Sequence, residues 1–113
     1  MTEQLEKVSP YDPYSTEENE KLEKDADRIR KRDLGDIRKI LSIPEGRRFF
    51  WRLLSEAGVF RASFTGDSLQ TAHNEGRREI GLIFLKDINA ANPSSFAQMQ
   101  REFVSEQNSK ENQ

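Results

Sequence analysis

The chain contains no cysteine and a single histidine, His73, among its 113 residues. The absence of cysteine excludes disulfides, thiolate metal sites and cysteine nucleophiles. One histidine without cysteine provides no spacing typical of a zinc site. The residues around His73 show no nucleophile turn that would complete a hydrolytic triad. We therefore expect a protein that is not an enzyme and that has no cofactor and no metal site.

A long apolar run and a surplus of positive charge are also missing. No apolar stretch approaches the ~20 residues needed to cross a bilayer, and no secretory signal opens the sequence. The chain holds 18 basic and 20 acidic residues, which gives a formal net charge of −2. General duplex-DNA binders usually concentrate excess Lys and Arg on one face. We expect a protein that is made in a cytoplasm and has no membrane span.

Most large apolar side chains lie between Asp36 and Asn92, and polar segments flank them. This pattern predicts one small core, of a size (roughly 60–70 residues) that is marginal by itself. We divide the chain into an extended arm, a helical core with a charged first helix, and a C-terminal helix with a frayed tail, over residues 1–15, 16–92 and 93–113. Tyr11 and Tyr14 belong either to a disordered leader or to a strap that anchors on a neighbouring subunit.

Helical periodicity, caps and breaks predict five helical segments and no strand. The first starts at Ser15 or Thr16 and reaches Arg32, and Asp33 caps a short second one that ends at Leu41. The others cover residues 44–57 up to Gly58, a segment from Ser68 or Thr71 to about Ala91 before Asn92-Pro93, and a C-terminal helix capped by Ser94 or Ser95. The expected fold is all-α, a small irregular bundle with extended polar N- and C-terminal arms.

Apolar side chains at helical spacing predict the core. In the segment 44–57, Phe50, Leu53 and Leu54 follow a buried stripe, which Trp51 and Phe49 widen on either side. Gly76 and Gly81 lie inside the segment 68–91, where each costs ~1 kcal/mol relative to alanine, so we expect another backbone to approach there. The predicted core residues are Phe49, Phe50, Trp51, Leu53, Leu54, Ile80, Ile83, Phe84 and Ile88.

The stretch EGRRFFWRLL, residues 45–54, combines arginines with aromatic rings, and a second EGRR occupies residues 75–78. Proteins that bind single-stranded nucleic acid use aromatic rings to stack on bases and arginines to bind phosphates. The helical spacing, however, assigns the rings of this stretch to the core. Arginine is also favoured at protein interfaces. The candidate interaction residues are Arg47, Arg48, Arg52, Arg77, Arg78, Tyr11 and Tyr14. A head-to-tail contact, in which an acidic-leaning arm lies on the arginine face of the next copy, is one reading; an ordinary solvated surface is the other.

Several motifs together resemble a known family. They are the RDL at residues 32–34 with DIRKIL after it, the run S-x-P-E-G-R-R-F-x-W-R-L-L at 42–54, GVFR at 58–61 and N-E-G-R-R-x-I-G-L at 74–82. The stretch 32–89 is similar to a small family of proteins from tailed, podovirus-like bacteriophages. That family is named after a Bordetella phage protein encoded in the head-morphogenesis gene cluster.

The resemblance implies a structural or virion-assembly protein with no catalytic residues. Its expected partners are other phage structural proteins (portal, capsid, scaffold or tail components), and we expect several copies, in the host cytoplasm during assembly and then in the virion. An internal or ejected virion protein with weak, non-specific DNA contact is one alternative. A small regulator of nucleic-acid processes is another.

Overall fold

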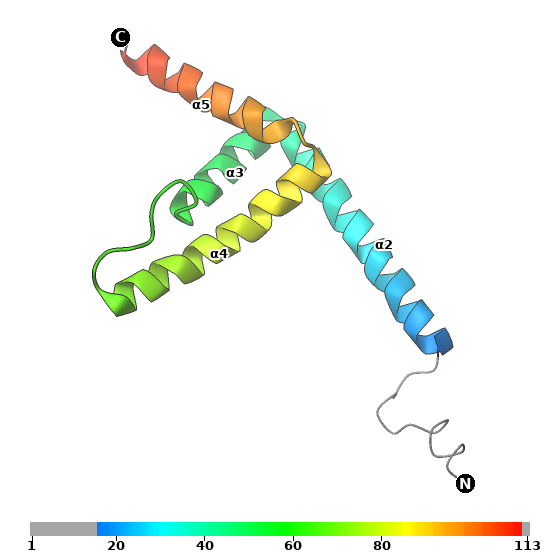
Figure 1. Ribbon diagram of the computed structural model, residues 1–113. Helices are drawn as coiled ribbons and strands as arrows, with labels where there is room; N and C mark the ends of the chain where they lie inside the picture. Colours follow the sequence, from blue (N-terminus) through cyan, green and yellow to red (C-terminus); the bar gives the residue numbers. More distant parts are fainter. Residues whose placement is uncertain (1–15, 112–113) are drawn as a thin grey trace. The chain divides into compact units, whose positions relative to one another are not determined.

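The computed structural model describes residues 16–111, and within them the chain forms four helices and no strand. These are α2 (Thr16–Leu41), α3 (Pro44–Glu56), α4 (Ser68–Ala91) and α5 (Ser95–Glu111) (Figure 1). The predicted all-α class is confirmed, while the count of five helices is wrong. The predicted arm of residues 1–15, with Tyr11 and Tyr14, lies outside the described residues.

The count differs because α2 does not break where the sequence predicted. It runs through Asp33 and Gly35 without interruption. An aspartate or a glycine inside a helix costs at most about 1 kcal/mol, and a helix that has already formed continues cooperatively until something removes its hydrogen bonds. The first such break is Ser42-Ile43-Pro44, because helix is disfavoured for the residue before a proline.

The chain nevertheless divides into two compact units between Arg32 and Asp33. In the first unit the described residues are 16–32, and every one of them is exposed. Its apolar residues Leu22, Ala26 and Ile29 follow one helical stripe, with Leu22 52% and Ile29 41% exposed. This segment of α2 therefore buries almost no apolar surface against residues 16–111.

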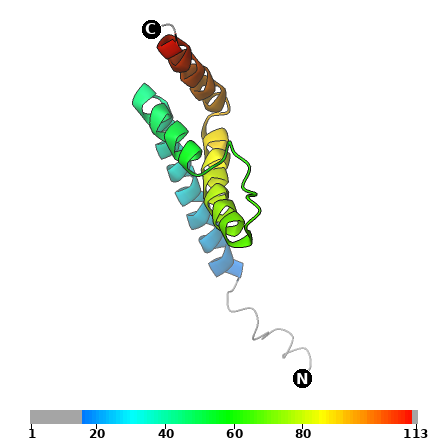
Figure 2. The same ribbon diagram turned by 90° about the vertical axis from the view of Figure 1, so that its left-hand side faces the viewer.

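The second unit, described from residue 33 to residue 111, holds the core. Helices α3, α4 and α5 pack against one another in pairs, and α3 runs beside α4 (Figures 1 and 2). The buried apolar side chains are Leu41, Phe50, Leu54, Ile88, Ala91 and Met99. Met99 comes from α5, so the C-terminal helix contributes to the core.

Local signals place α3 as the sequence predicted. Ile43 is extended, with φ −119° and ψ 146°, and Pro44 occupies the first turn, where its missing N–H costs nothing. At the other end, Gly58 has a φ of +81°. The N–H of Gly58 donates to the Ser55 carbonyl (3.0 Å) and the N–H of Val59 to the Leu54 carbonyl (3.1 Å). This is a Schellman motif with glycine in the left-handed position.

α4 begins one residue after Asp67, whose carboxylate accepts from the N–H groups of Leu69 (2.9 Å) and Gln70 (3.2 Å). This N-cap satisfies two donors of the first turn. Further along, a Cβ added at Gly81 would collide with Val59 and Ala57, so the predicted close approach is confirmed there. The same prediction is wrong for Gly76, because nothing lies within 4 Å of its Cβ position.

Six of the nine predicted core residues contribute to the core. Phe50, Leu54 and Ile88 are buried, and Trp51, Leu53 and Phe84 are partly buried against them.

The prediction is wrong for Phe49, Ile80 and Ile83, whose side chains are 50%, 55% and 52% exposed. Successive residues of a helix point about 100° apart, so a helix packed on one side can bury only part of a wide apolar stripe. Within the part of the chain that the structure describes, the face of α4 that carries Ile80 and Ile83 stays half-exposed.

Candidate protein-interaction site

The first arginine of the motif is part of the scaffold. Arg47 is 8% exposed, and its Nε and Nη2 donate to the Glu102 carboxylate of α5 at 2.8 and 3.0 Å. Its Nη1 donates to the Leu41 carbonyl at the end of α2, at 2.9 Å. One guanidinium thus joins three helices, and a fork-shaped pair of this kind is geometrically specific. The prediction counted Arg47 among the residues that meet a partner, whereas the structure places it inside.

This contact shifts the pKa values of both Arg47 and Glu102. The hydrogen bond from Arg47 lowers the pKa of Glu102 below its ordinary value, burial opposes that shift, and the positive charges of Arg47, Arg48 and Arg101 add to the lowering. The hydrogen bond to Glu102 raises the pKa of Arg47, again against burial, with help from the charges of Glu102 and Glu45. Both groups are therefore charged at neutral pH, and the pair is a permanent link between α3 and α5.

Beside this link, a groove opens between α3 and α5. Its cavity measures about 400 Å³. The apolar part consists of Trp51, Met99 and Phe103, and the charged part of Arg48 and Arg52 from α3 with Glu102 and Glu106 from α5; Pro44 and Arg47 complete the lining. We call this the α3–α5 groove.

An aromatic cluster supports one side of the groove. The Trp51 ring stacks on Phe103 with centroids 5.1 Å apart, and on Phe60 at 4.8 Å. Phe96 lies 5.8 Å from the same ring. Such contacts add stability beyond area burial. They hold the only tryptophan of the chain in place at the groove, while Phe103 keeps 39% of its surface open.

The two outer arginines of the motif remain on the surface. Arg48 and Arg52 are exposed, and the guanidinium of Arg52 lies 5.9 Å from the centroid of the half-exposed Phe49 ring. Arginine stems cover apolar surface while the planar heads reach carboxylates, which is why arginine is favoured at interfaces. An apolar strip edged by such groups is suited to an amphipathic segment with acidic side chains.

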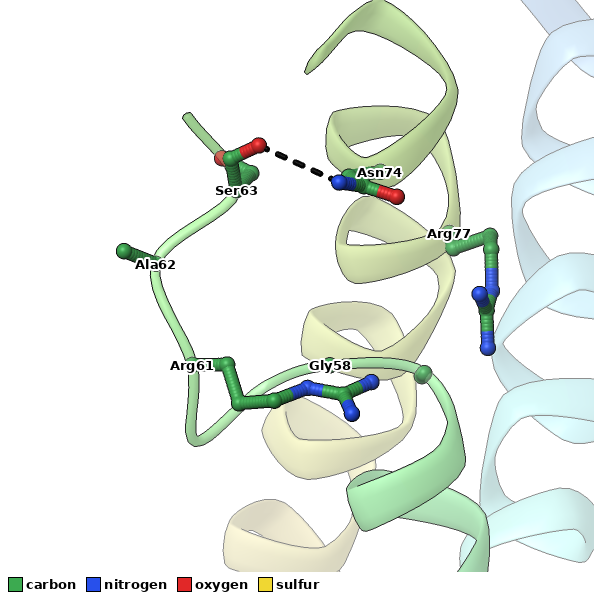
Figure 3. A pocket seen from close by; sticks show the side chains of 7 residues that line it. Gly58, Arg61, Ala62, Ser63, Asn74 and Arg77 are labelled. Atoms are coloured by element: carbon green, nitrogen blue, oxygen red, sulfur yellow. Dashed lines mark hydrogen bonds between the residues drawn. The ribbon is translucent and has the colours of Figure 1, made fainter. Parts of the chain in front are cut away.

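A second, more polar pocket of about 310 Å³ lies where α3 ends (Figure 3). Asn74 of α4 donates to the Ser63 carbonyl at 3.2 Å, and the Arg61 side chain extends toward Gly58. Arg77 of α4 donates to the Glu56 carbonyl in the last turn of α3. That turn has no basic residue of its own, so Arg77 supplies the positive charge that a helix C-terminus favours.

The structure therefore separates the arginines that the sequence grouped on one face. Arg48 and Arg52 line the α3–α5 groove, Arg77 lines the polar pocket, and the two cavities share no lining residue. Arg78 is half-buried on α4. Glu102, Phe103 and Glu106 were not among the predicted site residues, although an acidic pair four residues apart in a helix with Met99 and Phe103 is a usable signal for a face that meets an arginine-rich helix.

Residues 16–111 contain no cluster of three or more His, Cys, Asp or Glu residues arranged to hold a metal ion. None of the helices in this range has the length and apolar character of a membrane span. His73 is exposed on α4.

A model of the family described as Bbp19-like phage protein matches residues 37–101, which is more than half of the chain. The matched region starts in the last turns of α2 and ends in α5, one residue before Glu102. It contains most of the residues of the α3–α5 groove but not the segment 16–32. No curated protein and no solved structure matches the chain.

Proposed function

The chain belongs to the Bbp19-like phage protein family, and we propose that it is a non-enzymatic structural or virion-assembly protein. It binds head, portal or tail-junction components, is present in several copies, and acts in the host cytoplasm during assembly and then in the virion. The observation that carries the proposal is the α3–α5 groove, where the partly exposed Trp51 and the exposed Phe103 lie in the same cavity as the exposed Arg48 and Arg52.

The chemistry of the groove supports binding instead of catalysis. Its charged groups are guanidiniums and carboxylates, and Arg47 already engages Glu102. The groove lining contains no serine, threonine or histidine that a neighbouring base could activate. Its area is modest, which suits one contact among several in a large assembly.

The placement of the arginines supports a protein partner over DNA. Arg47 donates to the Glu102 carboxylate, and Arg77 donates to the Glu56 carbonyl. Nε of Arg38 donates to the Ala91 carbonyl at 3.0 Å. Glu106 shares the groove with Arg48 and Arg52. A binder of the phosphate backbone needs several uncompensated cations along one track. The ion pair with Glu102 removes Arg47 from such a track, and the hydrogen bonds to carbonyls hold Arg77 and Arg38 at helix ends.

The test replaces Arg48 and Arg52 by glutamate in a phage that carries the variant gene. Purified particles are analysed by mass spectrometry, and the melting temperature of the purified protein is measured in parallel. We expect the protein to remain folded and to fall at least about tenfold in the particles, because like charges across an interface cost several kcal/mol. The matched control is Lys86→Glu with Lys110→Glu, which makes the same charge change at exposed positions that do not line the groove.

Incorporation of the Arg48→Glu, Arg52→Glu protein at the wild-type level would contradict the proposal. A DNA-retention column at several salt concentrations addresses the alternative role. If the wild-type chain stays on duplex DNA at physiological salt and the double variant does not, the function is DNA contact instead. We expect the wild-type chain to elute in the unbound fraction.

A further inference from the structure

We infer that the occupant of the α3–α5 groove is residues 16–27 of a second copy of this chain. The inference rests on the proposed use of the groove as a protein-docking site, and it names the partner. We call residues 16–27 the acidic segment. It forms the first three turns of α2, outside the unit that contains the groove.

The acidic segment and the residues that follow it form a helix with an uncovered apolar stripe. Leu22, Ala26 and Ile29 lie on one face at spacings of four and three, and Leu22 and Ile29 are 52% and 41% exposed. Isolated helices of this length are marginal in water. A surface that buries the stripe would supply the packing that the described chain does not provide.

The charges of the two surfaces are complementary. The acidic segment carries six carboxylates and only two lysines: Glu17, Glu18, Glu20, Glu23, Asp25 and Asp27 against Lys21 and Lys24. Glu23 and Asp25 flank the stripe on either side. In the groove, Arg48 and Arg52 are exposed on the α3 wall, while the third arginine is neutralised by Glu102.

The charges that follow the acidic segment also fit the groove. Residues 28–32 follow the acidic segment with Arg28, Arg30, Lys31 and Arg32. Glu106 lies on the α5 wall of the groove, opposite the arginine wall. With the acidic segment beside Arg48 and Arg52, the basic residues that follow it can pair with Glu106. Leu22 then meets the apolar strip of Trp51 and Phe103.

Each copy would carry both a groove and an acidic segment, so contacts run from one copy to the next. Such heterologous contacts produce rings or filaments, or a reciprocal dimer when two copies exchange segments. Two charge-reversed full-length chains test this arrangement. The groove variant is Arg48→Glu with Arg52→Glu, and the segment variant is Glu23→Lys with Asp25→Lys. Molar mass is measured by size-exclusion chromatography with light scattering over a range of concentrations.

We expect the wild-type chain to reach the mass of at least two copies, and each variant alone to associate about tenfold more weakly or worse. An equimolar mixture of the two variants should associate again, because the unchanged segment of the groove variant fits the unchanged groove of the segment variant. The Lys86→Glu, Lys110→Glu protein is the matched control and should associate like the wild type. The fluorescence of Trp51, the only tryptophan, should change on association.

Several outcomes would overturn the inference. A mixture that stays monomeric would show that the two surfaces do not meet. A segment variant that associates like the wild type would indicate another occupant, and loss of association on deleting residues 1–15 alone would assign the groove to that stretch. If the wild-type chain is monomeric but the groove variant is still lost from particles, the inference fails and the proposed function stands. If incorporation is also unaffected, both fail.

Discussion

The tetrapeptide Glu-Gly-Arg-Arg occurs twice, at residues 45–48 in α3 and at residues 75–78 in α4, and the two copies meet different surroundings. Gly46 is buried at the turn from α2 to α3, where a Cβ would collide with the carbonyl of Ile40. Gly76 is exposed, and its Cβ position is empty. The first glycine allows two backbones to meet, whereas the second leaves a helix face open.

The arginines that follow differ in the same way. Arg47 is buried and links α3 to α5 and to the end of α2. Arg77 is exposed and makes a hydrogen bond to the end of α3. A motif of four residues therefore specifies helix in both places but not the role of its side chains. Those roles depend on which helix packs against each copy.

The largest expected effect separates the two glycines. Gly46→Ala should destabilise the fold by about 3 kcal/mol, since the Ile40 backbone would have to move and overpacking a tight contact costs about this much. The free energy of unfolding can be measured by urea denaturation, followed by circular dichroism and Trp51 fluorescence. A variant as stable as the wild type would show that the turn between α2 and α3 can open without cost.

A somewhat smaller effect should separate the two arginines. Arg47→Ala should cost about 2–3 kcal/mol, because it removes a buried side chain and leaves the Leu41 carbonyl and the Glu102 carboxylate without their partner. Arg77→Ala removes one hydrogen bond at an exposed position and should cost less than about 1 kcal/mol. The same denaturation series compares them. Equal losses of stability would mean that the ion pair between α3 and α5 contributes no more than one exposed hydrogen bond.

The pH dependence of the free energy of unfolding tests the contribution of the Arg47–Glu102 ion pair separately. Arg47 lowers the pKa of Glu102 in the folded chain. The stabilisation is therefore complete above the ordinary carboxyl pKa and is lost as the pH falls through the lowered folded value. Because Glu102 is partly exposed, we expect a difference of about 1 kcal/mol between the wild type and Glu102→Gln at pH 7, shrinking in acid. A difference that does not change with pH would exclude this origin.

The smallest expected effect is a gain in stability. Gly76→Ala should stabilise the isolated protein by about 0.5–1 kcal/mol, because alanine loses less conformational freedom in a helix and meets no neighbour. Thermal melting of Gly76→Ala beside Gly46→Ala provides the matched pair. A loss of stability at Gly76 would indicate that another surface already packs on that face of α4 in solution.

Much of the fold could be predicted from local signals. Pro44, Gly58 and Asn92-Pro93 mark helix ends because they restrict or release the backbone wherever they occur. The core positions Phe50, Leu54 and Ile88 follow from helical spacing. The helix break expected at Asp33 does not occur, because the cooperativity of a formed helix outweighs the weak local preference of aspartate and glycine for other conformations.

The candidate site was less predictable. Arg48 and Arg52 were identified as candidate interaction residues and Trp51 as a core residue, but the groove residues Glu102, Phe103 and Glu106 lie about fifty residues away, in the mostly polar C-terminal helix. Ion pairs and grooves form between elements that meet only after folding. No spacing along the chain indicates that Arg47 reaches Glu102 while Arg48, the next residue, faces solvent.

The sequence by itself determined that this protein is helical, where most helices end, and which family it resembles, because these follow from backbone restrictions and from motifs read along the chain. The tertiary structure alone decided which face of each helix is covered. It buried Gly46 and Arg47, left Gly76, Ile80 and Ile83 open, and formed the α3–α5 groove. The physical reason is that burial and ion pairing depend on distances in space, which the linear order of residues does not contain.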